Sequence, residues 1–243
     1  MPKLLFVSLF FLLFLPGRTF LYAQTPFRLH SPEDYITGGG LIGFTIGSNL
    51  VYRNKSSLSE EEIARVNIYS VNKFDRSAAY QYSVQAAHWS DGLLVAGILA
   101  PATLYCGSEF RKGSLTVSVM ALETILLTAA EMQLVKGLVK RKRPFVYNSS
   151  APVSEKRKAD ATASFFSGHT ALTATATMYT ATVYTLTHPN RSRDPWIWAG
   201  AAAIPAATGF LRYKAGKHFP SDIIAGFLVG TLNGILIPQL HKR

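Results

Sequence analysis

Three short groups of residues in the second half of the chain carry side chains suited to phosphoryl transfer. In chain order they are Lys136-x6-Arg143-Pro144, Ser167-Gly168-His169 and Arg212-x5-His218-x3-Asp222. Phosphoryl transfer spreads negative charge over the oxygens of the transferred group, so it needs cations and oriented N–H donors. Each group alone is weak evidence, because a Lys or Arg after an apolar helix is more often a headgroup anchor.

The residue types divide naturally into charge-binding groups and acid–base groups. Lys136, Arg143 and Arg212 supply positive charge, and each arginine can hold two phosphate oxygens at once. Ser167 and the backbone N–H of Gly168 stand at the predicted start of a helix, where an anion is favoured. Together these five residues could bind a phosphate group.

The two histidines can share the remaining chemistry. A neutral imidazole can attack phosphorus, and a carboxylate on its other nitrogen fixes the tautomer and stabilises the cation that forms. His218, with Asp222 four residues later, meets this requirement. His169 is then available to protonate the leaving oxygen and later to activate the hydrolytic water.

Six apolar stretches explain how groups so far apart in sequence can meet. They are residues 35–51, 93–106, 115–135, 165–186, 196–211 and 223–240. A transmembrane helix needs about 20 apolar residues, which the third, fourth and sixth stretches reach comfortably. If consecutive helices are antiparallel, all three groups lie at one end. We therefore predict an all-α membrane helical bundle of about six helices.

The N-terminal part is expected to serve export and membrane attachment. Residues 1–23 combine Lys3 with an apolar run and a possible cleavage site, which predicts a signal peptide, or a retained signal anchor. Residues 24–90 are expected to form membrane-associated helices, and residues 91–243 the catalytic membrane domain.

Two local patterns refine this picture of the N-terminal part. Gly39, Gly43 and Gly47 recur every four residues, which predicts close helix packing. Residues 53–89 begin with a capping box, Ser59 to Glu62, and predict an amphipathic helix on the membrane surface.

Composition narrows the possible partners. The chain has 243 residues, 48% of them hydrophobic, and a net charge of +11. Much of the positive charge lies between residues 136 and 158, in a connection between apolar stretches. We therefore expect an anionic partner at a membrane rather than a nucleic acid. Because Cys106 is the only cysteine, the chain can form neither an internal disulfide nor a Cys-rich zinc site.

The three groups resemble the signatures of the type 2 phosphatidic acid phosphatase (PAP2) superfamily, which is related to class A acid phosphatases and vanadium haloperoxidases. The resemblance covers roughly residues 90 to 240. It implies phosphate binding by Lys136, Arg143, Ser167, Gly168 and Arg212. It also implies His218 as the nucleophile, His169 as the acid/base and Asp222 as the residue that orients His218, with no metal or other cofactor.

Two positions depart from the family pattern. Phe166 stands where the second signature usually has proline, and Leu211 stands where the third usually has serine before its arginine. Neither departure removes a charge or a proton donor. We expect changed loop packing rather than lost activity.

The expected reaction is hydrolysis of a lipid phosphate monoester or pyrophosphate through a phosphohistidine. Phosphatidic acid, phosphatidylglycerol phosphate, undecaprenyl diphosphate and lipid A phosphates all fit the motifs. The alternatives are a soluble-type acid phosphatase, a vanadate haloperoxidase, and a non-catalytic protein that binds anionic lipid. A serine hydrolase through Ser167 is weaker, because Ser-Gly-His is not a Gly-x-Ser-x-Gly elbow.

The resemblance implies a multi-pass protein of the bacterial inner membrane whose site faces the periplasm. If the signal is cleaved and all six stretches cross, the motifs lie on the cytoplasmic side, which the positive-inside rule favours. A periplasmic site requires one early stretch not to cross. We expect the periplasmic face, because the cations have a phosphate-binding reason to be there.

Overall fold

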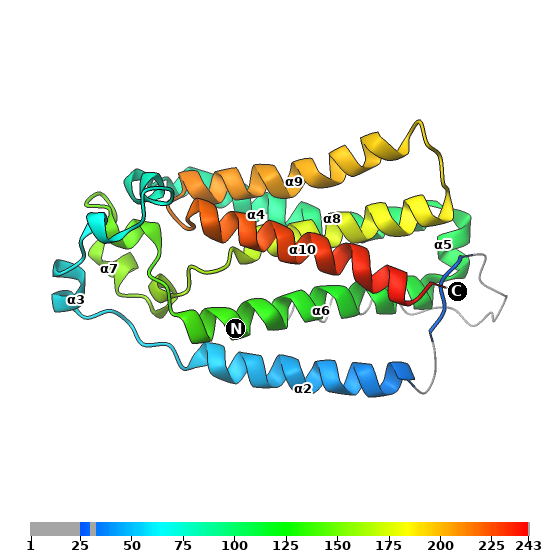
Figure 1. Ribbon diagram of the computed structural model, residues 1–243, viewed down its shortest axis with the longest axis horizontal. Coiled ribbons are helices and arrows are strands. Elements are labelled where there is room, and N and C mark those ends of the chain that lie inside the picture. The colour runs from blue at the N-terminus through cyan, green and yellow to red at the C-terminus, as the bar shows by residue number, and fades with distance from the viewer. Residues whose placement is uncertain (1–24, 30–32, 243) are drawn as a thin grey trace.

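The computed structural model describes residues 25–29 and 33–242, and this part of the chain is an all-α bundle. The predicted signal peptide therefore lies outside the described residues. Successive long helices run antiparallel (Figure 1). They are α2 (Glu33–Arg53), α4 (Val84–Ile98), α6 (Ser114–Val139), α8 (Gly168–Thr187), α9 (Asp194–Lys214) and α10 (Pro220–Leu240). The predicted all-α fold is confirmed.

Short helices cover the two ends of the bundle. They are α3 (Glu60–Ala64), η1 (Ile68–Ser70), η2 (Arg76–Tyr80), η3 (Ala100–Cys106), α5 (Ser108–Lys112), η4 (Pro144–Tyr147), α7 (Val153–Lys156) and η5 (Ala159–Thr162). The short helices α3, η1 and η2 lie with α7 beyond the end of α6, whereas α5 lies at the opposite end (Figure 1). The break between α4 and η3 falls just before Pro101, which cannot continue the hydrogen bonding of the helix.

The prediction that residues 53–89 form an amphipathic surface helix is wrong. The capping box of Ser59 and Glu62 is present, but it starts a helix of only five residues. Leu58 is buried in a hydrophobic cluster with Phe145. Val71 is buried in a separate cluster with Phe219. The segment is held against the loops of the bundle by these contacts, so it does not form one continuous helix.

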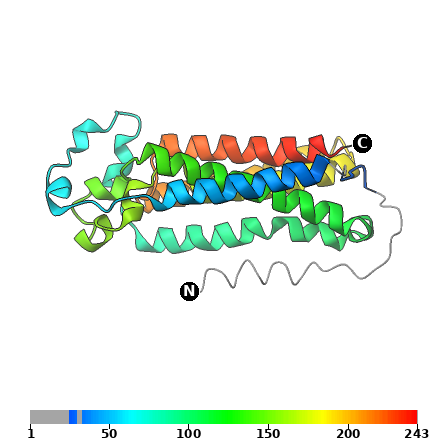
Figure 2. The ribbon, with the colours of Figure 1, turned by 90° about the horizontal axis from the view of Figure 1, so that it is seen from below.

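Helix α8 is the centre of the bundle. It contacts α4, α6, α9 and α10, which surround it (Figures 1 and 2). Eight of its 20 residues are threonines, and most return their hydroxyl to the preceding turn, as Thr177 does to the carbonyl of Thr173 at 2.8 Å. The polar groups are thus satisfied within the helix, which lets a threonine-rich segment occupy a buried position.

Three regions of the described chain are long and apolar enough to cross a membrane: residues 84–106, 114–147 and 220–240. These include the second, third and sixth apolar stretches. The fourth stretch, helix α8, was expected to reach this threshold and does not, because its eight threonines lower its hydropathy. The outer helices carry exposed apolar side chains, including Ile42, Leu228 and Leu232. The bundle is therefore suited to membrane association.

The prediction that Gly39, Gly43 and Gly47 allow close helix packing is also wrong among the described residues. These glycines lie on α2, and a Cβ added to any of them would meet no described atom within 4 Å. Helix α2 instead packs on the outside of α6 (Figure 2). There Gly137 of α6 allows the backbone of Val51 to approach, because an added Cβ would lie 2.8 Å from the Val51 carbonyl.

The small-residue pattern that does pack closely belongs to α10. Gly226, Gly230 and Gly234 recur every four residues and face the backbone of α8. An added Cβ would lie 2.5 Å from the Ser167 carbonyl oxygen at Gly226, and 2.7 Å from that of Thr175 at Gly234. These glycines let α10 approach α8 closely, which brings the start of α10 against the start of α8.

We expect Gly230→Ala to destabilise the fold and Gly43→Ala not to do so. A Cβ at Gly230 would collide with the carbonyl oxygen of Ala171, at a cost of about 1–3 kcal/mol for overpacking. At Gly43 the added methyl meets nothing described, and alanine is the better helix former. Thermal unfolding of both variants in the same detergent checks this. Equal midpoints would contradict the close packing of α8 and α10.

Candidate active site

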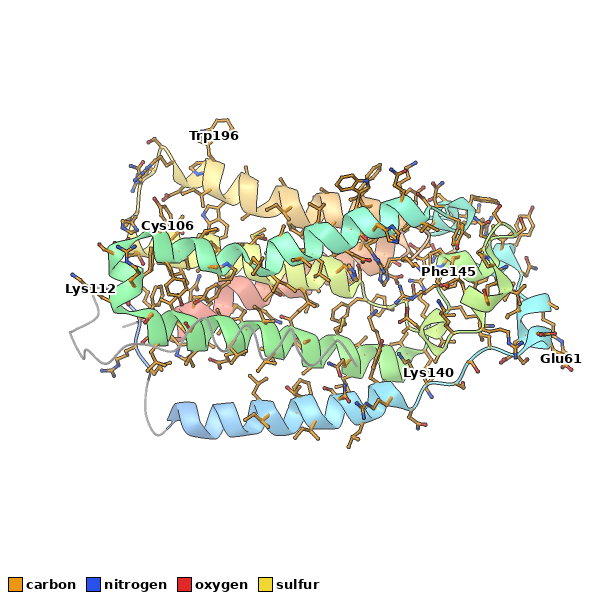
Figure 3. The ribbon with its side chains drawn as sticks, turned by 180° about the vertical axis from the view of Figure 1, so that it is seen from behind. Glu61, Cys106, Lys112, Lys140, Phe145 and Trp196 are labelled. Atoms are coloured by element: carbon orange, nitrogen blue, oxygen red, sulfur yellow. The ribbon has the colours of Figure 1, made fainter. Side chains whose placement is uncertain are left out.

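The three groups of residues predicted from sequence lie at one end of the bundle. Lys136 is in the last turn of α6, Arg212 is in the last turn of α9, and Asp222 is in the first turn of α10. Ser167 is the N-cap of α8. In Figure 3, Lys140 and Phe145 mark this end, and Cys106, Lys112 and Trp196 mark the opposite one.

Arg143 is buried and forks between a carboxylate and a histidine. Its Nη2 donates to Asp160 Oδ1 at 3.0 Å, and its Nε donates to the Asp160 carbonyl at 2.8 Å. Its Nη1 lies 3.3 Å from Nε2 of His218. Burial disfavours the charged form of Asp160, but Arg143 and Lys136 outweigh burial and hold the pKa of Asp160 below its usual value. The carboxylate therefore stays ionised and fixes the guanidinium.

His218 is a buried, neutral imidazole among cations. Burial, and then the nearby cations led by Arg143, hold the pKa of His218 well below its ordinary value of 6.5. Its Nδ1 lies 3.6 Å from Oδ2 of Asp222, which is longer than a hydrogen bond. Among the described residues, Nδ1 has no hydrogen-bond partner. The imidazolium form is thus disfavoured and the ring is neutral, and Asp222 lies just beyond hydrogen-bonding distance.

Asp222 is held by several donors besides its approach to His218. Its Oδ2 accepts from the Ser164 hydroxyl at 2.5 Å and from the backbone N–H of Phe219 at 2.9 Å. Its Oδ1 accepts from Nη1 of Arg141 at 2.5 Å. A carboxylate bound by three donors is fixed in position.

Arg141 extends this network to the N-terminal segment. Its Nη2 donates to Oδ2 of Asp75 at 2.7 Å, and the hydroxyl of Ser221 donates to the same oxygen at 2.6 Å. The guanidinium also stacks on the Phe219 ring, 4.1 Å from its centroid. Residues 72–80 therefore take part in positioning the first turn of α10.

Ser167 and Gly168 form the tightly packed start of α8. The backbone N–H of Ser167 donates to the Asp222 carbonyl at 2.9 Å, and its hydroxyl pairs with that of Thr170 at 2.8 Å. A Cβ on Gly168 would collide with the sulfur of Met132 on α6. A side chain at this position would therefore force the flexible Met132 side chain to move. Lys136 Nζ donates to the Ala163 carbonyl at 2.8 Å, on the same side of the site.

His169 and Arg212 line a cleft of about 380 Å³, which also includes Asp160 and Lys217. Asp91 of α4 lies in this cleft too, with Oδ1 2.7 Å from Nε2 of His169 and 3.5 Å from Nη1 of Arg212. Burial, and then the charge of Arg212, lower the pKa of His169 to about 3, although Asp91 opposes this shift.

A larger hollow of about 680 Å³ lies elsewhere, at the opposite end, lined mainly by apolar residues of η3, α8 and α9. It contains none of the residues of the three groups. The cleft with His169 is therefore the cavity that belongs to the site.

The arrangement concentrates positive charge around two histidines. Within the part of the chain that the structure describes, no three His, Cys, Asp or Glu side chains gather closely enough to hold a metal ion. Besides Arg141 and Lys217, the basic side chains at the site are the three predicted from sequence, Lys136, Arg143 and Arg212. A phosphate group is the natural ligand for such a set of cations beside a helix N-terminus.

The sequence analysis missed several polar residues of the site, among them Asp75, Asp91, Arg141 and Asp160. Arg141 stood in the basic stretch that the sequence analysis noted, but its neighbours gave it no distinct role. Asp91 stood two residues before an apolar stretch, and a lone carboxylate at such a place was the one available signal. The contacts of these residues join segments far apart in sequence, so spacing alone could not reveal them.

Comparisons with known proteins identify the family. A family model described as PAP2 superfamily matches residues 115–243, more than half of the chain. A search of curated proteins and a search of solved structures each found no match. The matched region contains all eight residues predicted for the site. The chain belongs to the PAP2 superfamily, and its site is consistent with a phosphatase.

Proposed function

We propose that the protein is a membrane lipid phosphatase that works through a phosphohistidine on His218. One observation carries the proposal: Nε2 of the buried His218 ring lies 3.3 Å from Nη1 of Arg143, whose guanidinium is fixed in place by Asp160. A nucleophile beside a rigid cationic fork is what in-line attack on a bound phosphate requires.

The reaction has two balanced steps. In the first, a ring nitrogen of His218 attacks phosphorus, the bond from phosphorus to the leaving oxygen breaks, and that oxygen takes a proton from His169. In the second, water gives a proton to His169 and attacks the phosphohistidine. The phosphorus–nitrogen bond then breaks, and inorganic phosphate and His218 are released.

Bound phosphate also explains how His169 can act as an acid. The free site holds its pKa low because burial and Arg212 disfavour the imidazolium. A phosphate dianion between Arg143 and Arg212 offsets those charges and raises the pKa of His169. His169 therefore gains its proton when substrate binds. Arg143, Arg212 and Lys136 neutralise the negative charge that develops on the phosphoryl group. The proposed reaction therefore needs no metal ion.

The residues that line the cleft favour a substrate that stays in the bilayer. Val84, Ala87 and Asp91 of α4 line it, and α4 begins one of the three regions able to cross a membrane. A phosphorylated headgroup at the membrane surface can reach His169 while its chains remain in lipid. We propose phosphatidic acid, phosphatidylglycerol phosphate, undecaprenyl diphosphate or a lipid A phosphate as the substrate, at the periplasmic face of a bacterial inner membrane.

The test is phosphate release from a panel of these four lipids by purified protein in detergent, with EDTA present. We expect turnover of at least one lipid, and no loss of rate on chelation, because the charge is supplied by side chains. A non-phosphorylated lipid of the same chain length is the blank. Binding without release from any lipid would overturn the phosphatase and favour a lipid-binding protein. A rate that EDTA abolishes would overturn the metal-free mechanism.

A further inference from the structure

Asp91 has contacts that the reaction described above does not yet use. It lies on α4, and its side chain is 58% exposed in the cleft. It accepts a hydrogen bond from Nε2 of His169 at 2.7 Å, and its distance to Arg212 is 3.5 Å. An ionised carboxylate only accepts hydrogen bonds, so Nε2 must be the protonated nitrogen of His169.

We propose that Asp91 is the positioning residue of the acid/base His169: it fixes the tautomer and ring orientation so that Nδ1 exchanges the proton with the leaving oxygen. This inference rests on the proposed function. It gives His169 the kind of carboxylate support that the sequence analysis assigned to His218 alone. A carboxylate in this position also stabilises the imidazolium form.

The charges around His169 show why such support is needed. Arg212 faces it from α9, and Arg143 and His218 face it from the loops. The two arginines disfavour its protonation, as does burial, whereas Asp91 from α4 favours it. In the free site Asp91 is the named neighbour that favours the imidazolium, and it opposes burial and the arginines without outweighing them. When bound phosphate offsets the arginines, the carboxylate adds to the stabilisation of the protonated acid.

A purely structural role makes a different prediction. Asp91 joins α4 to the starts of the site helices, so its loss could simply loosen the cleft. Loosening would slow all substrates alike. Loss of acid support slows only those substrates whose leaving group needs a proton, because a good leaving group departs as an anion.

The experiment therefore compares two leaving groups in Asp91→Asn. The substrates are the lipid phosphate turned over by wild type, with an alcohol leaving group, and p-nitrophenyl phosphate, with an acidic phenol. We expect kcat/KM for the lipid to fall at least about 10-fold further than kcat/KM for p-nitrophenyl phosphate, since general acid catalysis contributes about 100-fold or more. The ratio kcat/KM is used because it covers only the steps up to the phosphoenzyme.

The control is Ser90→Ala. Ser90 is the neighbour of Asp91, and its hydroxyl contacts Arg212 at 3.2 Å. Its loss is expected to reduce kcat/KM for both substrates by the same factor, because Arg212 holds phosphate in both. If Asp91→Asn lowers kcat/KM by the same factor for both substrates, and His169→Ala shows that the enzyme requires His169, then only the positioning role of Asp91 is overturned. A wild type inactive on both, or indifferent to His169→Ala, would instead overturn the proposed function.

Discussion

His218→Ala is expected to lower phosphate release by at least about 1,000-fold, because the variant has no nucleophile to form the covalent intermediate. The ring is buried among Arg143, Lys136 and Arg212, so its removal leaves the cations without an attacking group. Initial rates on the lipid that wild type turns over, at equal protein concentration, measure the effect. Thermal unfolding of the variant confirms that the fold is intact.

The matched control for this prediction is His88→Ala. His88 also lines the cleft, but the proposed reaction gives it no role. Its variant should keep the wild-type rate within about a factor of three, as expected for a surface substitution that costs no more than about 0.5 kcal/mol. If both variants lose a comparable share of the rate of phosphate release, the loss in His218→Ala reflects damage to the cleft rather than loss of a nucleophile.

Arg143→Lys is expected to lower kcat/KM by about 100-fold or more, although it preserves the charge. The guanidinium makes directed contacts with Asp160, His218 and the Lys217 carbonyl, and it is almost wholly buried. A lysine ammonium is a point charge without the planar fork, so it cannot keep these contacts and grip two phosphate oxygens. Initial rates with the lipid substrate at low concentration measure this loss.

Arg157→Lys is the control in the same basic connection. Arg157 is 58% exposed, and among the described residues it forms an ion pair with Glu60, at 3.0 Å, on the surface. Such exposed pairs contribute about 0–1 kcal/mol, and either cation can form them. We expect its rate to match wild type. A full rate in Arg143→Lys would mean that positive charge alone is sufficient at that position, and the bidentate role would be wrong.

The sequence predicted the place of the site better than the contacts within it. Lys136, Ser167 and Arg212 could be assigned to one end of the bundle because each adjoins the end of an apolar stretch. That inference needs only antiparallel helices. Asp91 and His169 are 78 residues apart, and their hydrogen bond depends on the rotation of α4 about its own axis. A single sequence does not fix that rotation.

The glycine patterns show the same limit. Gly39 and Gly43 on α2 follow the same four-residue spacing as Gly226 and Gly230 on α10. Only the second pair faces a neighbouring backbone, because α10 packs on the central helix whereas the glycines of α2 face away from α6. Spacing indicates that a helix can approach a neighbour closely. It does not tell which helices have a neighbour on that face.

The measurement that tests the account most directly is the site of phosphorylation in His169→Ala. This variant should still accept phosphate from p-nitrophenyl phosphate but should hydrolyse the phosphoenzyme slowly. The protein is quenched in alkali, where phosphohistidine survives, and its peptides are analysed by mass spectrometry. We expect one phosphoryl group on His218, and none in the double variant that also carries His218→Ala. Phosphate on Ser167, or turnover by wild type without any phosphoenzyme in the variant, would contradict the account.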